Sequence, residues 1–355
     1  MNPNRKIPKS LPLVLILFVA YCAYRIWPTS PGAPTAVVTL TGPTMGTTYQ
    51  VKLSSGLLSP DSRKALQQSI NNELDKVNEA MSTYLQESEL SQFNQNESVE
   101  PVKLSDATFE VLLLAQSISK LSNGAFDVTV GPLVNAWGFG PAQAQEIDDT
   151  ALAGLRKRIG FQKLFLDSSN HTATKQRADL YVDLSAIAKG YAVDKISERL
   201  TELNQPNHMV EVGGEIRVSG LNGDKKPWRL GIEKPTDQAR VVQEILHLSN
   251  HSMATSGDYR NFIEKDGKRY SHTIDPRMGR PVEHSLASVT VITPTCAKAD
   301  GLATALSVLG PKSGFDLAQK EKIAALFIIR EPNGEFSNKA SDEFEKLRGH
   351  KASDP

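Results

Sequence analysis

Apolar residues recur along this chain with two periods, which predict separate helices and strands. Ser59 and Pro60 are typical of a helix start, a cap followed by proline in the first turn. The apolar positions that follow at helical spacing are Leu66, Ile70, Leu74, Val77 and Met81. A second helix is predicted over 105–121, because Asn123-Gly124 is a left-handed cap signal. Further helices are expected near 151–159, from Ser185 onward, from about 296 to Gly310, and over 311–319.

Alternating positions predict strands between and after these helices. Strands over 37–41 and 47–53 would flank a turn at 42–46, which is rich in glycine. Predicted strands in the second half cover 179–184, 208–218, 228–233, 242–248, 288–292 and 323–329. Gly213-Gly214 inside such a strand suggests a bulge or a close ligand approach, residues 222–224 a hairpin turn, and 253–262 a polar turn. Mixed helices and strands with several antiparallel signals predict an α+β fold.

The N-terminal 27 residues differ from the remainder and are typical of an export segment. Arg5, Lys6 and Lys9 precede an apolar run over 11–24. An uncleaved membrane anchor is the first expectation, a lipid on Cys22 the second, and a cleaved, soluble form the third. Residues 28–35 then read as a linker, 36–335 as one domain, and 336–355 as a charged tail with little to bury.

Charge and cysteine content exclude several classes of protein. Lys+Arg and Asp+Glu are both 40 and the sequence pI is about 7.1, so a polyanionic partner such as nucleic acid is not expected. Two cysteines cannot form a disulfide framework, and Cys296 is expected to be a small buried residue. The chain contains no P-loop, dinucleotide-binding glycine fingerprint, nucleophile elbow or zinc-helix motif.

Candidate chemistry begins with Asp300 and Thr304. They lie four residues apart on a predicted helix, so both side chains occupy one face. A carboxylate and a hydroxyl so placed can share one hard cation. Such a pair is more often a solvated helix face, so it needs support from elsewhere in the chain.

Three other stretches add polar or flexible residues. The run 124–140 contains four glycines, and two further aromatic residues follow Phe126. This composition is typical of a backbone that bends closely around a ligand, or of an ordinary structured loop. Asp183 ends a predicted strand just before a helix whose first turn carries Lys189, an arrangement that can hold an anion. His272 lies in a tight loop where Arg277 and Arg280 are expected beside it, which favours a functional histidine.

Taken in order, these stretches resemble the ApbE family of FAD:protein FMN transferases, also described as thiamine-biosynthesis lipoproteins. The motifs that carry the resemblance are Met45-Gly46-Thr47, Phe126-Asp127-Val128-Thr129-Val130-Gly131-Pro132, Asp183-Leu184-Ser185 through Lys189-Gly190-Tyr191, Glu211-Val212-Gly213-Gly214, Thr255-Ser256-Gly257 and His272-Thr273-Ile274-Asp275-Pro276 with Gly279-Arg280-Pro281. The resemblance extends from about Thr41 to the last predicted strand. It implies a single elongated, T-fold-like exported domain with a flavin cleft.

The resemblance also implies an activity. Such enzymes split FAD at its pyrophosphate, attach FMN to a Thr or Ser hydroxyl of an envelope flavoprotein and release AMP. Acceptors include subunits of the Na⁺-translocating NADH:quinone reductase or related electron-transport complexes. The location implied is the periplasmic side of a bacterial inner membrane. A divalent cation, Mg²⁺, would neutralise charge on the diphosphate.

Site residues follow from matching positions. Asp300 and Thr304 would be side-chain ligands of Mg²⁺, together with the backbone carbonyl of Ala186. His272 would lie next to the reacting phosphate and take the proton of the incoming hydroxyl. The residues expected to contact FAD or to lie beside it are Met45, Ser82, Thr83, Tyr84, Phe126, Asp127, Val128, Asp183, Lys189 and Ile274.

Two positions differ from the residues that some members of the family carry. Two alternative functions also remain open. Ala303 stands where some relatives carry a second acid, and Lys189 where at least some carry an acidic residue. The alternatives are an FAD pyrophosphatase that releases free FMN and AMP, and a non-catalytic periplasmic FAD-binding protein.

Overall fold

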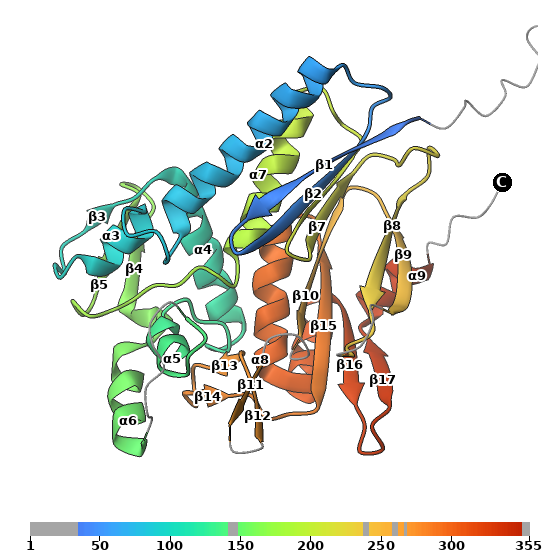
Figure 1. Ribbon diagram of the computed structural model, residues 1–355. Coiled ribbons are helices and arrows are strands. Elements are labelled where there is room, and N and C mark those ends of the chain that lie inside the picture. The colour runs from blue at the N-terminus through green and yellow to red at the C-terminus, as the bar shows by residue number, and fades with distance from the viewer. Residues whose placement is uncertain (1–34, 141–147, 237–240, 258–261, 266–267, 350–355) are drawn as a thin grey trace, which may run out of the picture.

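A long antiparallel sheet organises the molecule (Figure 1). The computed structural model describes residues 35–140, 148–236, 241–257, 262–265 and 268–349. The sheet is 8-stranded in the order β1-β2-β6-β7-β10-β15-β16-β17. Its strands are β1 (Val37–Thr44), β2 (Thr47–Ser54), β6 (His208–Val212), β7 (Glu215–Ser219), β10 (His251–Gly257), β15 (Leu286–Thr293), β16 (Ala324–Arg330) and β17 (Phe336–Ala340). The prediction of a mixed, largely antiparallel α+β fold is confirmed.

Helices cover one face of this sheet and form the main core with it. They are α2 (Pro60–Met81), α4 (Asp106–Leu121), α7 (Ala188–Glu202) and α8 (Cys296–Lys320). The apolar stripe predicted for α2 is buried, and Ser59 caps the helix by accepting from the backbone N–H of Ser62. All eight residues of β15 are buried, since that strand lies near the middle of the sheet with layers on both faces.

A second core lies on the opposite face. The two-stranded ribbon of β8 (Trp228–Glu233) and β9 (Val242–Leu248) packs there together with α9 (Asp342–Gly349). Residues 336–355 were expected to be a tail with little to bury. Within this stretch β17 extends the sheet and Phe344 is fully buried, so that expectation is wrong for 336–349. The high charge of this stretch concealed a short amphipathic helix, α9, which packs on the core through Phe344 and Leu347.

Smaller elements gather around one end of the sheet. They are α3 (Glu89–Gln95), α5 (Gly131–Ala136), α6 (Asp149–Arg158), a 3-10 turn η1 (Phe161–Lys163), and strands β3 (Val102–Lys103), β4 (Leu164–Asp167), β5 (Thr172–Lys175), β11 (Phe262–Lys265), β12 (Lys268–Ser271), β13 (Ile274–Asp275) and β14 (Arg280–Pro281). A third apolar cluster joins α5, α6 and β13. It places the predicted histidine loop against the glycine-rich run.

The strand predicted over 179–184 does not form. Leu180 and residues 182–184 are buried, but the backbone of this segment pairs with no strand. Instead the side chain of Asn94 bonds both the N–H and the carbonyl of Val182 at 2.8 Å, and Asp183 N–H donates to the Val128 carbonyl at 2.7 Å. A side chain therefore satisfies the polar groups that a neighbouring strand would satisfy in a sheet, which sequence periodicity cannot reveal.

Turns also differ from expectation. Gly213-Gly214 is no bulge within one strand but the two-residue turn between β6 and β7, with φ of 61° and 109°. The first hairpin turn is likewise shorter than predicted, because β1 continues to Thr44 and only Met45-Gly46 turn the chain. Residues 222–224 do form a turn, but β7 and β8 are not paired across it. Residues 253–257 belong to strand β10 rather than to a polar turn.

The two predicted C-terminal helices are confirmed as one kinked helix. Gly310 has φ 77° and ψ −173° inside α8, and Pro311 follows it. Glycine permits the left-handed bend and proline restarts the helix beyond it.

Residues 1–34, on which the anchor and most of the linker were predicted, lie outside the described residues. In the portion that the structure describes, every helix is too short or too polar to cross a bilayer.

Candidate active site

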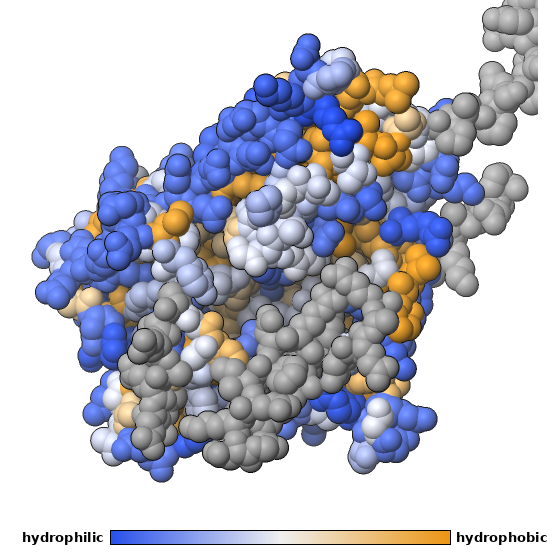
Figure 2. All heavy atoms as spheres, in the orientation of Figure 1, coloured by the Kyte–Doolittle hydropathy of each residue, from blue (hydrophilic) through white to orange (hydrophobic). Residues whose placement is uncertain are grey.

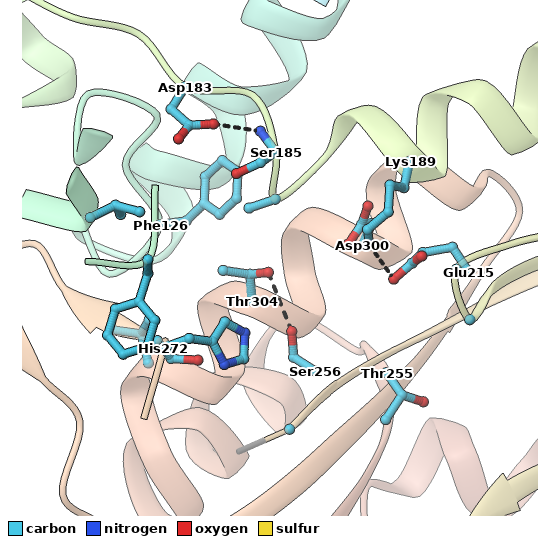
Figure 3. Close-up of a pocket in the computed structure, with 18 of the residues that line it drawn as sticks. Phe126, Asp183, Ser185, Lys189, Glu215, Thr255, Ser256, His272, Asp300 and Thr304 are labelled. Carbon is cyan, nitrogen blue, oxygen red and sulfur yellow. Dashed lines mark hydrogen bonds and ion pairs between the residues drawn. The ribbon is translucent and has the colours of Figure 1, made fainter. Parts of the chain in front are cut away.

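A cavity of about 1040 Å³ opens between the start of α8, the glycine-rich run and the β6–β7 turn. Figure 3 shows side chains from these distant segments facing one another across it. The predicted site residues that line it are Met45, Phe126, Asp127, Val128, Asp183, Ala186, Lys189, His272, Ile274, Asp300 and Thr304. The structure thus brings most of the predicted set to one place.

Asp300 and Thr304 occupy one face of α8, as their spacing predicts. Asp300 is 5% exposed, and its Oδ2 accepts from the Gly190 backbone N–H at 3.0 Å. A Cβ on Gly190 would come within 2.5 Å of the Cys296 carbonyl oxygen, so only glycine lets α7 and α8 cross this closely. Thr304 Oγ1 lies 3.3 Å from Ser256 Oγ on β10. Sheet and helices together therefore hold the carboxylate and the hydroxyl in place.

Lys189 joins Asp300 and Glu215 in a charged group on one side of the cavity (Figure 3). Lys189 Nζ lies 2.7 Å from Glu215 Oε1, and Glu215 is 5% exposed. Its second oxygen, Oε2, is buried and has no hydrogen-bond partner among the described residues. One ammonium between two carboxylates leaves surplus negative charge in a site largely removed from water.

The pKa shifts of these three groups follow from burial first and from their mutual charges second. Burial raises the pKa of Asp300, although the charge of Lys189 opposes the shift. Burial raises the pKa of Glu215 to about 7, with Lys189 opposing and Asp300 adding to it. Burial by itself lowers the pKa of Lys189, but the attraction of Asp300 and Glu215 outweighs it and the net shift is upward. Lys189 is therefore positively charged, and both carboxyl groups, those of Asp300 and Glu215, interact with this one charge.

Oxygen donors next to surplus negative charge fit a hard divalent cation. Asp300, Thr304 and Ala186 line the same cavity and carry a carboxylate, a hydroxyl and a backbone carbonyl. The described residues contain no group of three His, Cys, Asp or Glu side chains suited to a metal ion. The candidate set is hence the oxygen-rich, carboxylate-poor kind that leaves coordination positions for a phosphate ligand.

The glycine-rich run forms the opposite wall. The Asp127 carboxylate is fully engaged within the protein. It accepts from the Thr129 N–H at 2.8 Å and hydroxyl at 2.6 Å in its own loop, and from the Phe161 N–H of η1 at 2.8 Å. Phe126 and Val128 flank it and are each 2% exposed. Of the two interpretations of this run, the one in which it bends around a cavity is supported.

His272 enters the cavity from the loop before β13. The ring of Phe139 meets it edge-on, with ring centroids 6.3 Å apart. The two guanidinium groups expected beside it are engaged elsewhere: Arg277 pairs with Asp275 at 2.7 Å and Arg280 with Asp149 at 2.8 Å. Neither arginine lines the cavity. Their contribution is to hold the loop, not to supply charge next to the histidine.

Ser82, Thr83 and Tyr84 were expected to lie beside FAD, but the structure does not place them in the cavity lining. Tyr84 is 69% exposed. Ser82 Oγ accepts from the Tyr84 N–H at 3.1 Å as α2 ends. Thr83 is hydrogen-bonded to Tyr181, whose ring packs directly against Gly131.

Sequence reasoning assigned no role to several lining residues, among them Glu215 and Ser256. Glu215 follows the quoted Gly213-Gly214 motif directly, yet an isolated glutamate carried no signal of burial. Ser256 belongs to the quoted motif on β10 but received no role. The position of Glu215 immediately after a two-glycine turn is the sequence signal that could have identified it.

Comparison with known proteins decides the family. The sequence profile of the ApbE family matches residues 45–327. The FAD:protein FMN transferase of Haemophilus influenzae is 47% identical over 320 residues, which cover 88% of this chain and 92% of that protein. The chain belongs to the ApbE family. The FAD:protein FMN transferase of Escherichia coli K12 is 38% identical over 323 residues, covering 90% of this chain and 91% of that one.

Solved ApbE structures have the same fold. The flavin transferase ApbE of Vibrio cholerae matches with a TM-score of 0.81 and 45% identity, covering 88% of this chain and 100% of that one. The apo flavinyl transferase ApbE of Pseudomonas stutzeri matches with a TM-score of 0.79 and 39% identity, covering 88% and 97%. The family resemblance stated from the motifs is therefore confirmed over most of the chain.

Proposed function

We propose that this protein is an FAD:protein FMN transferase. The observation that carries the proposal is a single cavity that gathers His272, Asp300 and Thr304 from separate elements, in a chain of the ApbE family. Its volume of about 1040 Å³ is at the upper end of small-molecule sites, as a dinucleotide requires. ApbE relatives named for this reaction support the assignment.

In the proposed reaction the hydroxyl oxygen of an acceptor Thr or Ser attacks the flavin-side phosphorus of FAD. The bond from that phosphorus to the bridging oxygen breaks, AMP leaves with the bridging oxygen, and FMN remains on the acceptor as a phosphoester. His272 is placed in the same cavity and takes the hydroxyl proton as the new bond forms. The aromatic and aliphatic side chains of Phe126 and Val128 contact the nucleotide and keep water from the reacting phosphorus.

We further propose that Asp300, Thr304 and the Ala186 carbonyl hold Mg²⁺. When bound, the cation neutralises charge that develops on the diphosphate. Lys189 adds a fixed positive charge beside it, and Asp183 and Ile274 contact FAD. Residue 303 is a buried alanine, so this position supplies no second carboxylate.

The N-terminal apolar segment is proposed to anchor the protein in a bacterial inner membrane with this domain in the periplasm. A lipid on Cys22 and a cleaved form are the alternatives. The acceptor is proposed to be an envelope flavoprotein, such as a subunit of the Na⁺-translocating NADH:quinone reductase or a related electron-transport complex. Mass measurement of the membrane-extracted N-terminus distinguishes the three fates of the leader.

One assay tests the function. The full chain is incubated with FAD, Mg²⁺ and a candidate acceptor, and covalent flavin is read as fluorescence on a denaturing gel. Transfer of FMN to the acceptor is the expected result. Release of free FMN and AMP without labelled protein would make the protein an FAD pyrophosphatase. Tight FAD binding with neither product, and unchanged in Asp300→Ala, would make it a binding protein.

A further inference from the structure

Three segments meet at the end of the sheet where the described chain begins. They are residues 35–37, the loop 55–58 after β2, and the turn 220–226 after β7, together called the tip. Thr35 N–H donates to the Gly223 carbonyl at 2.7 Å, and Gly56 N–H donates to the Ala36 carbonyl at 3.2 Å. Segments far apart in sequence thus form one small surface, which Figure 1 places beside the start of β1.

The tip exposes apolar side chains that the fold does not cover. Leu57 is 93% exposed, Val37 45% and Leu221 40%. The neighbouring Leu58 packs onto the main core, so the loop buries one leucine and presents the other to solvent. Figure 2 shows an apolar area next to the point where the described chain begins. Exposed leucines scattered singly need no explanation, but a cluster at one end of a molecule does.

Basic side chains border this apolar area. Lys225 and Lys226 are both exposed in the turn 220–226 and outnumber its single acid, Asp224. Lys225 has φ 60°, a left-handed conformation that is uncommon for lysine. Apolar side chains rimmed by lysine are the pattern of a surface that binds anionic lipid headgroups.

The short connection to the leader determines what the tip can reach. Residues 28–34 separate Trp27, the last apolar residue of the leader, from Thr35. Eight residue steps span at most roughly 28 Å even when fully extended. A leader held in a bilayer therefore keeps the tip within that distance of the lipid surface. On so short a connection the local lipid concentration is high, and a contact that would be weak in solution is populated.

We propose that the tip is a membrane-contact surface, in which Leu57, Val37 and Leu221 enter the headgroup region of an anionic bilayer and Lys225 and Lys226 bind lipid phosphates. This inference rests on the membrane anchor of the proposed function but not on flavin transfer. It orients the domain on the membrane. The histidine loop next to β13 lies toward the other end of the molecule, so an acceptor protein reaches the cavity from the aqueous side (Figure 1).

Site-specific crosslinking to lipid tests the proposal. The full chain, carrying photo-leucine in place of Leu57, is reconstituted in vesicles of phosphatidylethanolamine and phosphatidylglycerol and irradiated. The matched control carries photo-leucine in place of Leu113, which is 41% exposed on α4. Lipid adducts counted by mass spectrometry are expected to be about ten-fold more abundant at 57 than at 113. Equal yields at both positions, adducts to protein instead of lipid, or a chain that does not sediment with the vesicles would overturn it.

Charge reversal tests the basic rim separately. Lys225→Glu with Lys226→Glu is expected to lower lipid adducts at 57 by at least about five-fold, the effect of losing one favourable lysine contact. The control, Lys312→Glu on α8, should leave the yield at its wild-type value in vesicles of the same phosphatidylglycerol content. Flavin transfer in detergent is expected to be equal in all these variants, so a failed transferase assignment and a failed membrane contact give different results. An unchanged adduct yield in the double variant counts against the lysine part of the proposal.

Discussion

Two buried charged clusters lie side by side between α7, β7 and α8, and each of these elements contributes to both. The first cluster joins Asp194 of α7 and Arg217 of β7 to the start of α8. The second is the cavity cluster of Lys189, Glu215 and Asp300, drawn from the same elements. In the first, one Asp194 oxygen accepts from Arg217 at 2.6 Å and from the Cys296 N–H at 2.8 Å, and the other accepts from the Ala297 N–H at 2.9 Å.

The two clusters differ in charge balance and in whether every carboxylate oxygen has a hydrogen-bond partner. The first cluster balances one negative charge with one positive charge and satisfies both carboxylate oxygens. The cavity cluster carries two carboxylates for one ammonium and leaves Glu215 Oε2 without a partner in the described structure. We call the Asp194 cluster closed, because every buried polar group in it is hydrogen-bonded, and such a cluster stabilises the fold. We call the cavity cluster of Lys189, Glu215 and Asp300 open; it costs stability unless a ligand completes it, which is typical of a functional site.

The largest effect is expected for Asp300→Ala, which removes an acid from the open cluster. Transfer of FMN is expected to fall about 1000-fold, as when a group that stabilises transition-state charge is lost. The unfolding free energy should change by less than about 1 kcal/mol, because the removal of surplus negative charge offsets the loss of the acceptor for the Gly190 N–H. Asp316→Ala, on the same helix but exposed, is the matched control. Activity within ten-fold of wild type would remove Asp300 from the catalytic machinery.

Asp194→Ala is expected to give the opposite pattern. It leaves Arg217 and two backbone N–H groups at the start of α8 without their acceptor, which should lower the unfolding free energy by about 3 kcal/mol. Chemical denaturation measures it. Glu198→Ala removes an exposed ion pair with Lys195 on the same helix and should cost less than about 0.5 kcal/mol. Equal losses of unfolding free energy in the two variants would mean that the closed cluster contributes no more to stability than an exposed ion pair.

Glu215→Gln tests the raised pKa of the open cluster. Burial raises the pKa of Glu215 from 4.5 to about 7, so the folded protein holds a proton there that the unfolded chain has lost. The resulting stabilisation is present below pH 4.5 and is lost as the pH rises toward 7. Without added metal, wild-type unfolding free energy should therefore decline relative to Glu215→Gln by about 1 to 3 kcal/mol over that interval. A constant difference would show that Glu215 has an ordinary pKa.

The smallest effect is expected for Ser256→Ala. Its hydroxyl lies 3.3 Å from Thr304 Oγ1, a long contact that positions the Thr304 hydroxyl only weakly. Transfer should fall about three-fold, and Ser256→Thr should restore it because the hydroxyl returns. Steady-state rates at varied Mg²⁺ measure the change. A loss as large as that of Asp300→Ala would place Ser256 among the groups that contact the substrate or the metal.

Much of the fold was predictable because it depends on local pattern. Helix α2 with its cap, the kink at Gly310 and strands β8, β9 and β16 follow from periodicity and turn residues. The failures near residue 182 and in the C-terminal segment share one cause, a long-range contact that overrides the local pattern. Asn94 satisfies the backbone around residue 182 in place of a strand, and Phe344 docks a segment that its charges marked as a tail.

The site shows the same division. Asp300 and Thr304 could be paired from sequence because four residues make about one helical turn. Placing Glu215 against Lys189 required the sheet order and the close crossing of α7 and α8 at Gly190, neither of which any local signal contains. The sequence by itself determined the long helices, about half of the described strands, the family and the candidate donors, since these reside in short-range spacing and motif order. Only the tertiary structure decided which charges share the cavity and which are closed off, because burial and net charge belong to the packed assembly of elements.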